Sequence, residues 1–132
     1  MCAAKTGSMS IRDDHDRNVT VFEASGPVTP EDVSLAVEER FSNGPRPNAI
    51  WDLTDADVSK WTNDGLRHVA AVSRKFVAGR ENGLSIIVVS DIAKQMFIKL
   101  YTAISEGELN SPITYVVLDT IDEAYAALDQ KS

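Results

Sequence analysis

Apolar and polar residues alternate along this chain with two different periods. Short runs rich in β-branched and aromatic residues predict strands, and longer stretches with apolar residues three and four positions apart predict amphipathic helices. The segment LSIIVVS is apolar at both odd and even positions, which is typical of a central strand in a largely parallel sheet. The predicted strands span 9–13, 18–25, 48–53, 84–90 and 113–118, and the predicted helices span 29–42, 62–78, 91–105 and 119–128.

Capping residues support these helix starts. In the sequence TPED, Thr29 can cap, Pro30 fits the first helical position, and two carboxylates follow near the positive end of the helix dipole. The first two strands are separated only by a polar turn, so we expect them to form a hairpin. Helices alternate with strands after this hairpin, which requires right-handed crossovers and a mostly parallel sheet. The predicted order is therefore ββαβαβαβα, an α/β arrangement.

Length and cysteine content suggest one domain in a reducing compartment. The chain has 132 residues, which suggests one domain, and we place it over 9–132. The chain starts with the small and polar residues MCAAKTGSMS, so we expect a disordered leader over 1–8. Its one cysteine cannot form an internal disulfide, so we expect a cytoplasmic protein. The leader lacks the apolar core of a signal peptide, and no apolar run approaches the ~20 residues that span a bilayer. We therefore expect no membrane insertion.

The net charge limits the classes of partner. The chain carries a formal charge of −7 and has a pI near 4.7. Such a surface repels a phosphate backbone, and it also disfavours anionic membranes. We expect no nucleic-acid binding.

The segment WDLTDADVSKWTNDGL, Trp51 to Leu66, reads as the end of a buried strand, an acidic loop and a helix start. Ligands of α/β proteins commonly bind at such strand ends. Its aspartates could hold Ca²⁺ or Mg²⁺, but the spacing lacks the glycine and the final glutamate of an EF-hand loop. The alternative is a solvated loop with one or two helix caps, and we predict no metal site.

The sequence lacks the residue patterns of several common catalytic sites. A receiver-type phospho-aspartate site needs a helix between the first two strands and a lysine after the last one, where this chain has Asp119 and Thr120. Neither His15 nor His68 has an evident partner, and the chain has no nucleophile elbow, P-loop or dinucleotide-binding glycine motif. We therefore predict neither catalytic residues nor a cofactor, and we expect that the protein is not an enzyme.

Three segments, VFEASGPVTPEDV, WDLTDADVS and VLDTIDEAYAAL, resemble the SpoIIAA-like family of small bacterial proteins over residues 9–130. That family is related to STAS domains, the anti-sigma-factor antagonists, and is sometimes grouped with CRAL-TRIO lipid-binding domains. The resemblance implies a five-stranded mixed sheet, with an N-terminal hairpin followed by parallel strands in sequential order. It also implies four helices, mainly on one side of that sheet.

The resemblance also identifies a position where regulation would occur. In antagonist domains, the serine before the glycine of a D-S-S-G-L motif is phosphorylated by a partner kinase. The corresponding stretch here ends in Asp64, Gly65 and Leu66, so an aspartate without a hydroxyl replaces that serine. Ser59 and Thr62 lie nearby, but neither occupies the matching position, and a loop residue and a helix cap are their simpler interpretations.

Two further features suggest binding. The predicted helix over 91–105 has a broad apolar stripe, which is either core or a surface for an apolar ligand or partner. The predicted helix over 62–78 and the residues after it are basic, through Arg67, Arg74, Lys75 and Arg80. These cations complement the negative end of the helix dipole, or they form a docking patch for an acidic partner.

We therefore expect a non-catalytic protein-interaction module, and the alternative is a carrier of a lipid or other small apolar ligand. If the helices cover one face of the sheet, the other face needs a homodimer contact, a bound apolar molecule or a crossing helix. A cavity near the third helix would favour the carrier, and a flat apolar dimer face would favour the interaction module. The candidate partner or ligand site comprises Asp55, Asp57, Ser59, Thr62, Asp64, Met96, Phe97, Leu100 and Tyr101.

Overall fold

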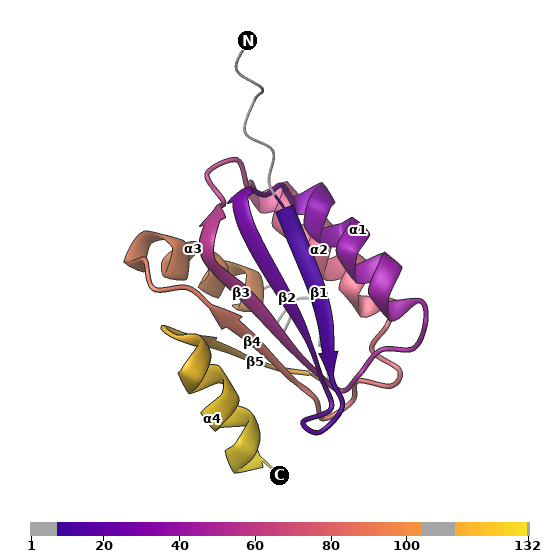
Figure 1. Cartoon of the computed structure of the whole chain (residues 1–132). Coiled ribbons are helices and arrows are strands. Elements are labelled where there is room, and N and C mark those ends of the chain that lie inside the picture. The colour runs from indigo at the N-terminus through magenta and orange to yellow at the C-terminus, as the bar shows by residue number, and fades with distance from the viewer. Residues whose placement is uncertain (1–7, 104–112, 132) are drawn as a thin grey trace.

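A computed structural model describes residues 8–103 and 113–131, and it has the predicted order of elements (Figure 1). The predicted α/β class is confirmed, with a five-stranded mixed sheet and four helices. None of the helices in this part of the chain is both long and apolar enough to cross a membrane. The strands are β1 (Ser8–Asp14), β2 (Val19–Pro27), β3 (Asn48–Asp57), β4 (Leu84–Val88) and β5 (Thr114–Leu118), and the helices are α1 (Pro30–Phe41), α2 (Asn63–Arg74), α3 (Ile92–Ala103) and α4 (Ile121–Lys131).

The strands lie side by side in sequential order. The sheet runs β1-β2-β3-β4-β5, with β1 antiparallel to β2 and every later pair parallel. This arrangement confirms the predicted hairpin and the parallel sheet that follows it. The carboxyl ends of β2 to β5 therefore meet at one edge, where the helices α1 to α4 begin.

Side chains on the two faces of β4 are buried in two separate apolar cores, as the uninterrupted apolar sequence of this strand predicts. Ile87 packs in a core with residues of α1 and α2 and with Ile98 of α3. Ile86 and Val88 point to the opposite face, where they pack with residues of α4. Figure 1 shows α4 on the opposite side of the sheet from α1 and α2.

The second face of the sheet is covered by the chain itself. Its apolar residues Val21, Ile86 and Val88 are at most 1% exposed, and Ala124 and Leu128 of α4 pack against the same core. Of the three covers that we expected, the structure shows the crossing helix. The second face therefore gives no reason to expect a homodimer or a bound apolar molecule there.

Two of the predicted boundaries, the ends of β3 and α2, differ from the structure by four residues each. We predicted a strand over 48–53 followed by an acidic loop, but β3 continues through Asp57, so Asp55 and Asp57 lie in the strand. The extension forms because β2 also continues to Pro27, and the two strands pair past a register shift between Glu23 and Ser25. The helix predicted over 62–78 ends at Arg74, with Lys75 as its C-cap.

Candidate functional site

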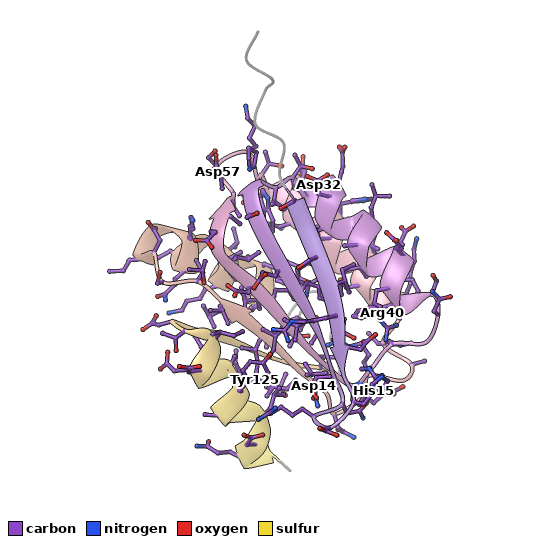
Figure 2. All side chains as sticks on the ribbon, in the orientation of Figure 1. Asp14, His15, Asp32, Arg40, Asp57 and Tyr125 are labelled. Carbon is purple, nitrogen blue, oxygen red and sulfur yellow. The ribbon has the colours of Figure 1, made fainter. Side chains whose placement is uncertain are left out.

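Carboxylates lie along the carboxyl edge of the sheet, at the end of β3 and in the first turns of α1 and α2. We call Asp32, Asp55, Asp57 and Asp64 the acidic edge. Asp57 and Asp32 lie at the same end of the molecule (Figure 2), and Val28 N donates to Asp57 O at 3.0 Å. All four side chains are exposed. Among the residues that the structure describes, no three His, Cys, Asp or Glu side chains are placed to hold a metal ion.

The two hydroxyl residues predicted at this edge have local structural partners. Ser59 N donates to Asp57 Oδ1 at 2.9 Å, and hydrogen bonds from the Ser59 side chain and backbone lower the pKa of Asp57. Thr62 is the N-cap of α2, because its Oγ1 accepts a hydrogen bond from Gly65 N at 3.0 Å. The cap interpretation of Thr62 is therefore confirmed.

The start of α3 is fixed to the same edge by two side chains. Lys94 Nζ donates to Ala56 O at 2.6 Å, and Gln95 Nε2 donates to Val89 O at 2.6 Å. Gln95 also donates to the carboxylate of Asp119 after β5. These contacts place the first turn of α3 beside the ends of β3, β4 and β5.

The α3 residues of the predicted site do not share one face of the helix. Met96 is 70% exposed and Leu100 is 40% exposed, and with Ile92 at 75% they form a solvent-facing set that we call the α3 stripe. Tyr101 is half-buried and faces the sheet, where its ring packs edge-on against the ring of Tyr115 with 5.8 Å between the ring centroids. A core role is therefore wrong for Met96 and Leu100. The Phe97 side chain lies outside the described residues.

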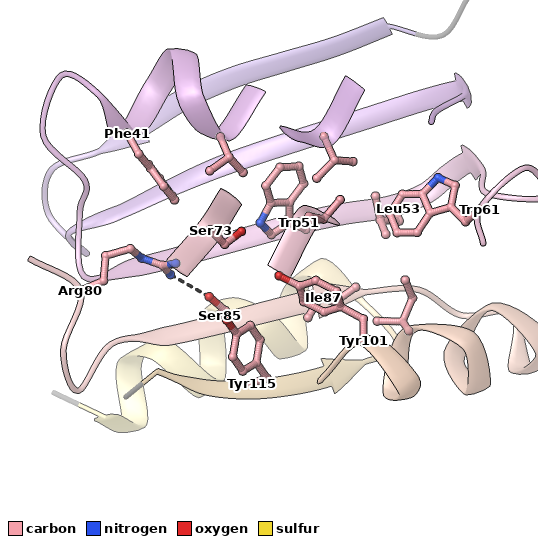
Figure 3. A pocket seen from close by; sticks show the side chains of 14 residues that line it. Phe41, Trp51, Leu53, Trp61, Ser73, Arg80, Ser85, Ile87, Tyr101 and Tyr115 are labelled. Atoms are coloured by element: carbon pink, nitrogen blue, oxygen red, sulfur yellow. Dashed lines mark hydrogen bonds between the residues drawn. The ribbon is translucent and has the colours of Figure 1, made fainter. Parts of the chain in front are cut away.

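A pocket lies between the first sheet face and helices α1 to α3, and we call it the Arg80 pocket (Figure 3). Its space amounts to about 540 Å³ with its open mouth included, but only about 40 Å³ of this admits the centre of a water molecule. It lies beside the third helix, where a cavity would favour the carrier alternative. Its principal side chains are Phe41, Trp51, Leu53, Trp61, Ser73, Arg80, Ser85, Ile87, Ile98, Tyr101 and Tyr115.

Arg80 places a cation at one end of this pocket although it is only 2% exposed. Its Nη2 donates to Ser85 Oγ at 2.7 Å, its Nε donates to the carbonyl oxygen of Arg46 at 3.2 Å, and its guanidinium lies 5.1 Å from the centroid of the Phe41 ring. Burial lowers the pKa of Arg80, and the nearby Tyr115 and Tyr101 oppose that change. No carboxylate in the described ranges forms an ion pair with it.

We did not predict this pocket from the sequence, because each of its residues has a simpler local interpretation. We interpreted Arg80 as a cation complementing the end of a helix, and the structure shows it buried beyond that helix. The usable signal was a pair of polar residues at apolar positions. Ser73 interrupts the buried stripe of α2 and Ser85 interrupts the most apolar strand, and both are buried at the pocket.

The two histidines lie outside the Arg80 pocket. His15 lies in the exposed turn after β1, where Arg46 Nη2 approaches its Nδ1 at 2.6 Å, so our statement that it lacks a partner was wrong. His68 is exposed on α2. Neither residue lines the Arg80 pocket.

Comparison with known proteins identifies the fold. No family model matches this sequence, and no curated protein matches it. An anti-sigma factor antagonist from Mycobacterium paratuberculosis is 21% identical, with 98% of this chain and 99% of that chain covered and a TM-score of 0.64. An uncharacterized protein of the DUF3478 family with a SpoIIAA-like fold, from Shewanella loihica PV-4, is 16% identical, with coverages of 97% and 98% and a TM-score of 0.61.

The anti-sigma factor antagonist SpoIIAA in its unphosphorylated form is 10% identical, with coverages of 92% and 98% and a TM-score of 0.58. These likenesses extend over almost the whole length of each protein. The SpoIIAA-like fold implied by the sequence resemblance is therefore confirmed.

Proposed function

We propose that this chain, as a protein of the SpoIIAA-like fold, is a non-catalytic regulatory module that binds a protein partner through the α3 stripe. The observation that carries the proposal is the exposure of Ile92, Met96 and Leu100, which recur every four residues on one helix. Two solved structures with this fold are named as anti-sigma factor antagonists, which supports a regulatory role. We also propose that the protein acts in the cytoplasm and needs no cofactor.

The exposed stripe has the features of a contact surface. Large apolar side chains that share one face of a helix bury apolar area when a partner covers them, and each Å² contributes about 25 cal/mol. A single exposed apolar residue needs no explanation, but a contiguous set does. Methionine and leucine at the centre of such a set suit a well-packed apolar contact.

The acidic edge defines the charge of the partner. Lys94 fixes the start of α3 beside β3, and its charge is close enough to Asp57 to lower the pKa of that carboxyl group. The apolar stripe is therefore adjacent to exposed carboxylates, which attract cations and repel anions. We propose a partner whose apolar surface is bordered by Lys or Arg side chains.

The proposed module lacks the hydroxyl expected at the antagonist phosphorylation position. Asp64 lies exposed in the first turn of α2, where it complements the helix dipole without any modification. Thr62 caps this helix, and Ser59 is engaged with Asp57. We therefore propose that phosphate at this position does not regulate the module.

Site-specific photo-crosslinking in the native host tests the partner surface. A photoreactive amino acid at Leu100 should give one defined protein adduct, whereas the same group at Gln130, exposed on α4 across the sheet, should not give it. Met96→Glu should abolish the Leu100 adduct, and Met96→Leu should retain it. An adduct of twice the chain mass would instead indicate a homodimer, and equal adducts from both positions would overturn the proposal.

A second candidate function, a carrier of a small ligand, is supported by the Arg80 pocket. The pocket lies beside Ile98 and Tyr101 of α3, and aromatic rings form much of its wall. Concave, mostly apolar sites with a few convergent polar groups are typical of small-molecule binding. Native mass spectrometry of protein purified from its host tests this function, because a co-purifying small molecule adds its mass to that of the chain.

A further inference from the structure

We infer that the Arg80 pocket binds a small organic acid, with a carboxylate held by Arg80 beside Ser85 and an aromatic or apolar body packed against the aromatic wall. This inference deepens the carrier function proposed above and rests on it. It changes the expected ligand from a purely apolar molecule to an anion. It also sets a limit on the size of that ligand.

The Arg80 side chain is buried, and only part of its guanidinium is hydrogen-bonded. A buried guanidinium without a carboxylate has lost its water, and only partial replacements are present. Ser85 and the Arg46 carbonyl oxygen each accept one hydrogen bond, from Nη2 and Nε respectively. These two bonds use Nε and one Nη2 hydrogen, which leaves Nη1 and the second Nη2 hydrogen for an acceptor in the pocket, and a carboxylate could use such donors in pairs.

The described wall of the pocket is positively charged. Among the described residues that line it, Arg80 alone is charged, and none is Asp or Glu. The chain as a whole carries −7, so this is a locally positive site in an acidic protein. Such a site favours anions over neutral analogues and rejects cations.

The rest of the pocket wall is largely aromatic. Trp51, Tyr101 and Tyr115 line the pocket with aromatic rings, and Phe41 lies against the Arg80 guanidinium. Figure 3 shows the Arg80 guanidinium directed toward Ser85, with Tyr115 and Ser73 close by. A flat aromatic or short apolar body fits between such rings, since aromatic pairs favour offset and edge-on contacts.

The pocket is small. Its space of about 540 Å³ includes the open mouth, and only about 40 Å³ admits the centre of a water molecule. A ligand therefore enters with small side-chain movements, and a lipid with two acyl chains does not fit. We therefore expect a ligand no larger than a single-ring acid, with part of its body in the open mouth.

A matched pair of probes tests the inference on the full chain. Cinnamate and cinnamamide have the same apolar body and differ in charge, and titration followed by the fluorescence of Trp51 and Trp61 measures both affinities. We expect cinnamate to bind at least about tenfold more tightly, because a guanidinium prefers a carboxylate to a neutral amide. Arg80→Met should reduce this preference to less than about twofold, and Lys75→Met, which removes an exposed cation after α2, should leave it unchanged.

Backbone amide shifts in two-dimensional NMR give a second measurement that needs no variant. Cinnamate should shift the signals of Ser85 and Tyr115 and leave those of Gln130 in place. Equal binding of the two probes would overturn this inference and leave the carrier function standing, whereas binding of neither probe would overturn both. Displacement of cinnamate by dioleoylphosphatidate vesicles would overturn the size argument and assign the pocket to a lipid.

Discussion

Asp13 joins three separate parts of the chain through its carboxylate. Its carboxylate accepts hydrogen bonds from Arg40 Nη2 at 2.7 Å, from Arg46 Nε at 3.0 Å and from Thr20 Oγ1 at 2.8 Å. These contacts tie the β1–β2 hairpin to the end of α1 and to the loop before β3. Because the carbonyl oxygen of Arg46 accepts from Arg80, the same loop also positions the cation of the pocket.

The pKa of Asp13 predicts a specific loss of stability in acid. The hydrogen bond from Arg40 lowers this pKa from 3.8 to about 2, although burial opposes the change. A carboxylate with a lowered folded-state pKa stabilises the protein above its unfolded-state value, and this contribution is lost as the pH falls from about 4 to about 2. Asp13→Asn should lower the free energy of unfolding by about 1 kcal/mol at pH 7 and very little at pH 2.

Urea unfolding at several pH values measures this difference between the two proteins. Asp14, Asp57 and Glu81 also have lowered pKa values and titrate in both proteins, so the comparison isolates the contribution of Asp13. A wild-type advantage that stays constant from pH 7 to pH 2 would refute the electrostatic explanation.

At the scale of elements, Gly65 sets the approach of α2 to the start of α1. A Cβ atom built on Gly65 would lie 2.5 Å from Pro30 Cγ and 3.0 Å from Pro30 Cβ. The proline ring is rigid and belongs to the first turn of α1, so the two helices would have to move apart to make room for this atom. The Gly-Leu pair that matched the antagonist motif therefore has a packing explanation in this chain.

Gly65→Ala should destabilise the protein by up to about 2 kcal/mol, because overpacking typically costs about 1–3 kcal/mol and the gain in helix propensity offsets only about 1 kcal/mol of this. Ala71→Gly, at an exposed position of the same helix, gives the size of the propensity effect alone. Chemical denaturation measures both variants. An increased free energy of unfolding for Gly65→Ala would show that the two helices are not in close contact.

The elements that the sequence predicted well are those whose pattern is local. The Thr29 cap, the period of α2 and the apolar run of β4 each depend on neighbouring residues, and the structure confirms all three. The extension of β3 to Asp57 depends on pairing with β2, which a local pattern does not contain. The Arg80 pocket is harder still, because Phe41, Arg80 and Tyr115 come from three separate regions of the chain.

At the scale of the whole molecule, α4 is the element that makes the second sheet face complete. Arg17 holds it through an ion pair of 3.1 Å to Asp129 and lies 4.9 Å from the centroid of the Tyr125 ring, and Arg12 Nη2 donates to Tyr125 Oη at 3.1 Å. Polar contacts from the hairpin thus surround an apolar centre at Ala124 and Leu128. An isolated chain can therefore keep this face dry.

This arrangement predicts a monomer whose self-association is controlled by α4. Sedimentation velocity at about 10–100 µM should show the wild-type chain as a monomer, because the buried second face offers no apolar contact area. A variant that ends at Thr120 exposes Ile86, Val88 and Val21, and at ~25 cal/mol per Å² of apolar area this surface favours dimers or larger assemblies that grow with concentration. Asp129→Ala removes an exposed ion pair and should stay monomeric. If the wild-type chain and Met96→Glu both form a dimer, the two copies contact each other through a surface other than the α3 stripe. That result would contradict the inference that α4 completes the cover of the second sheet face.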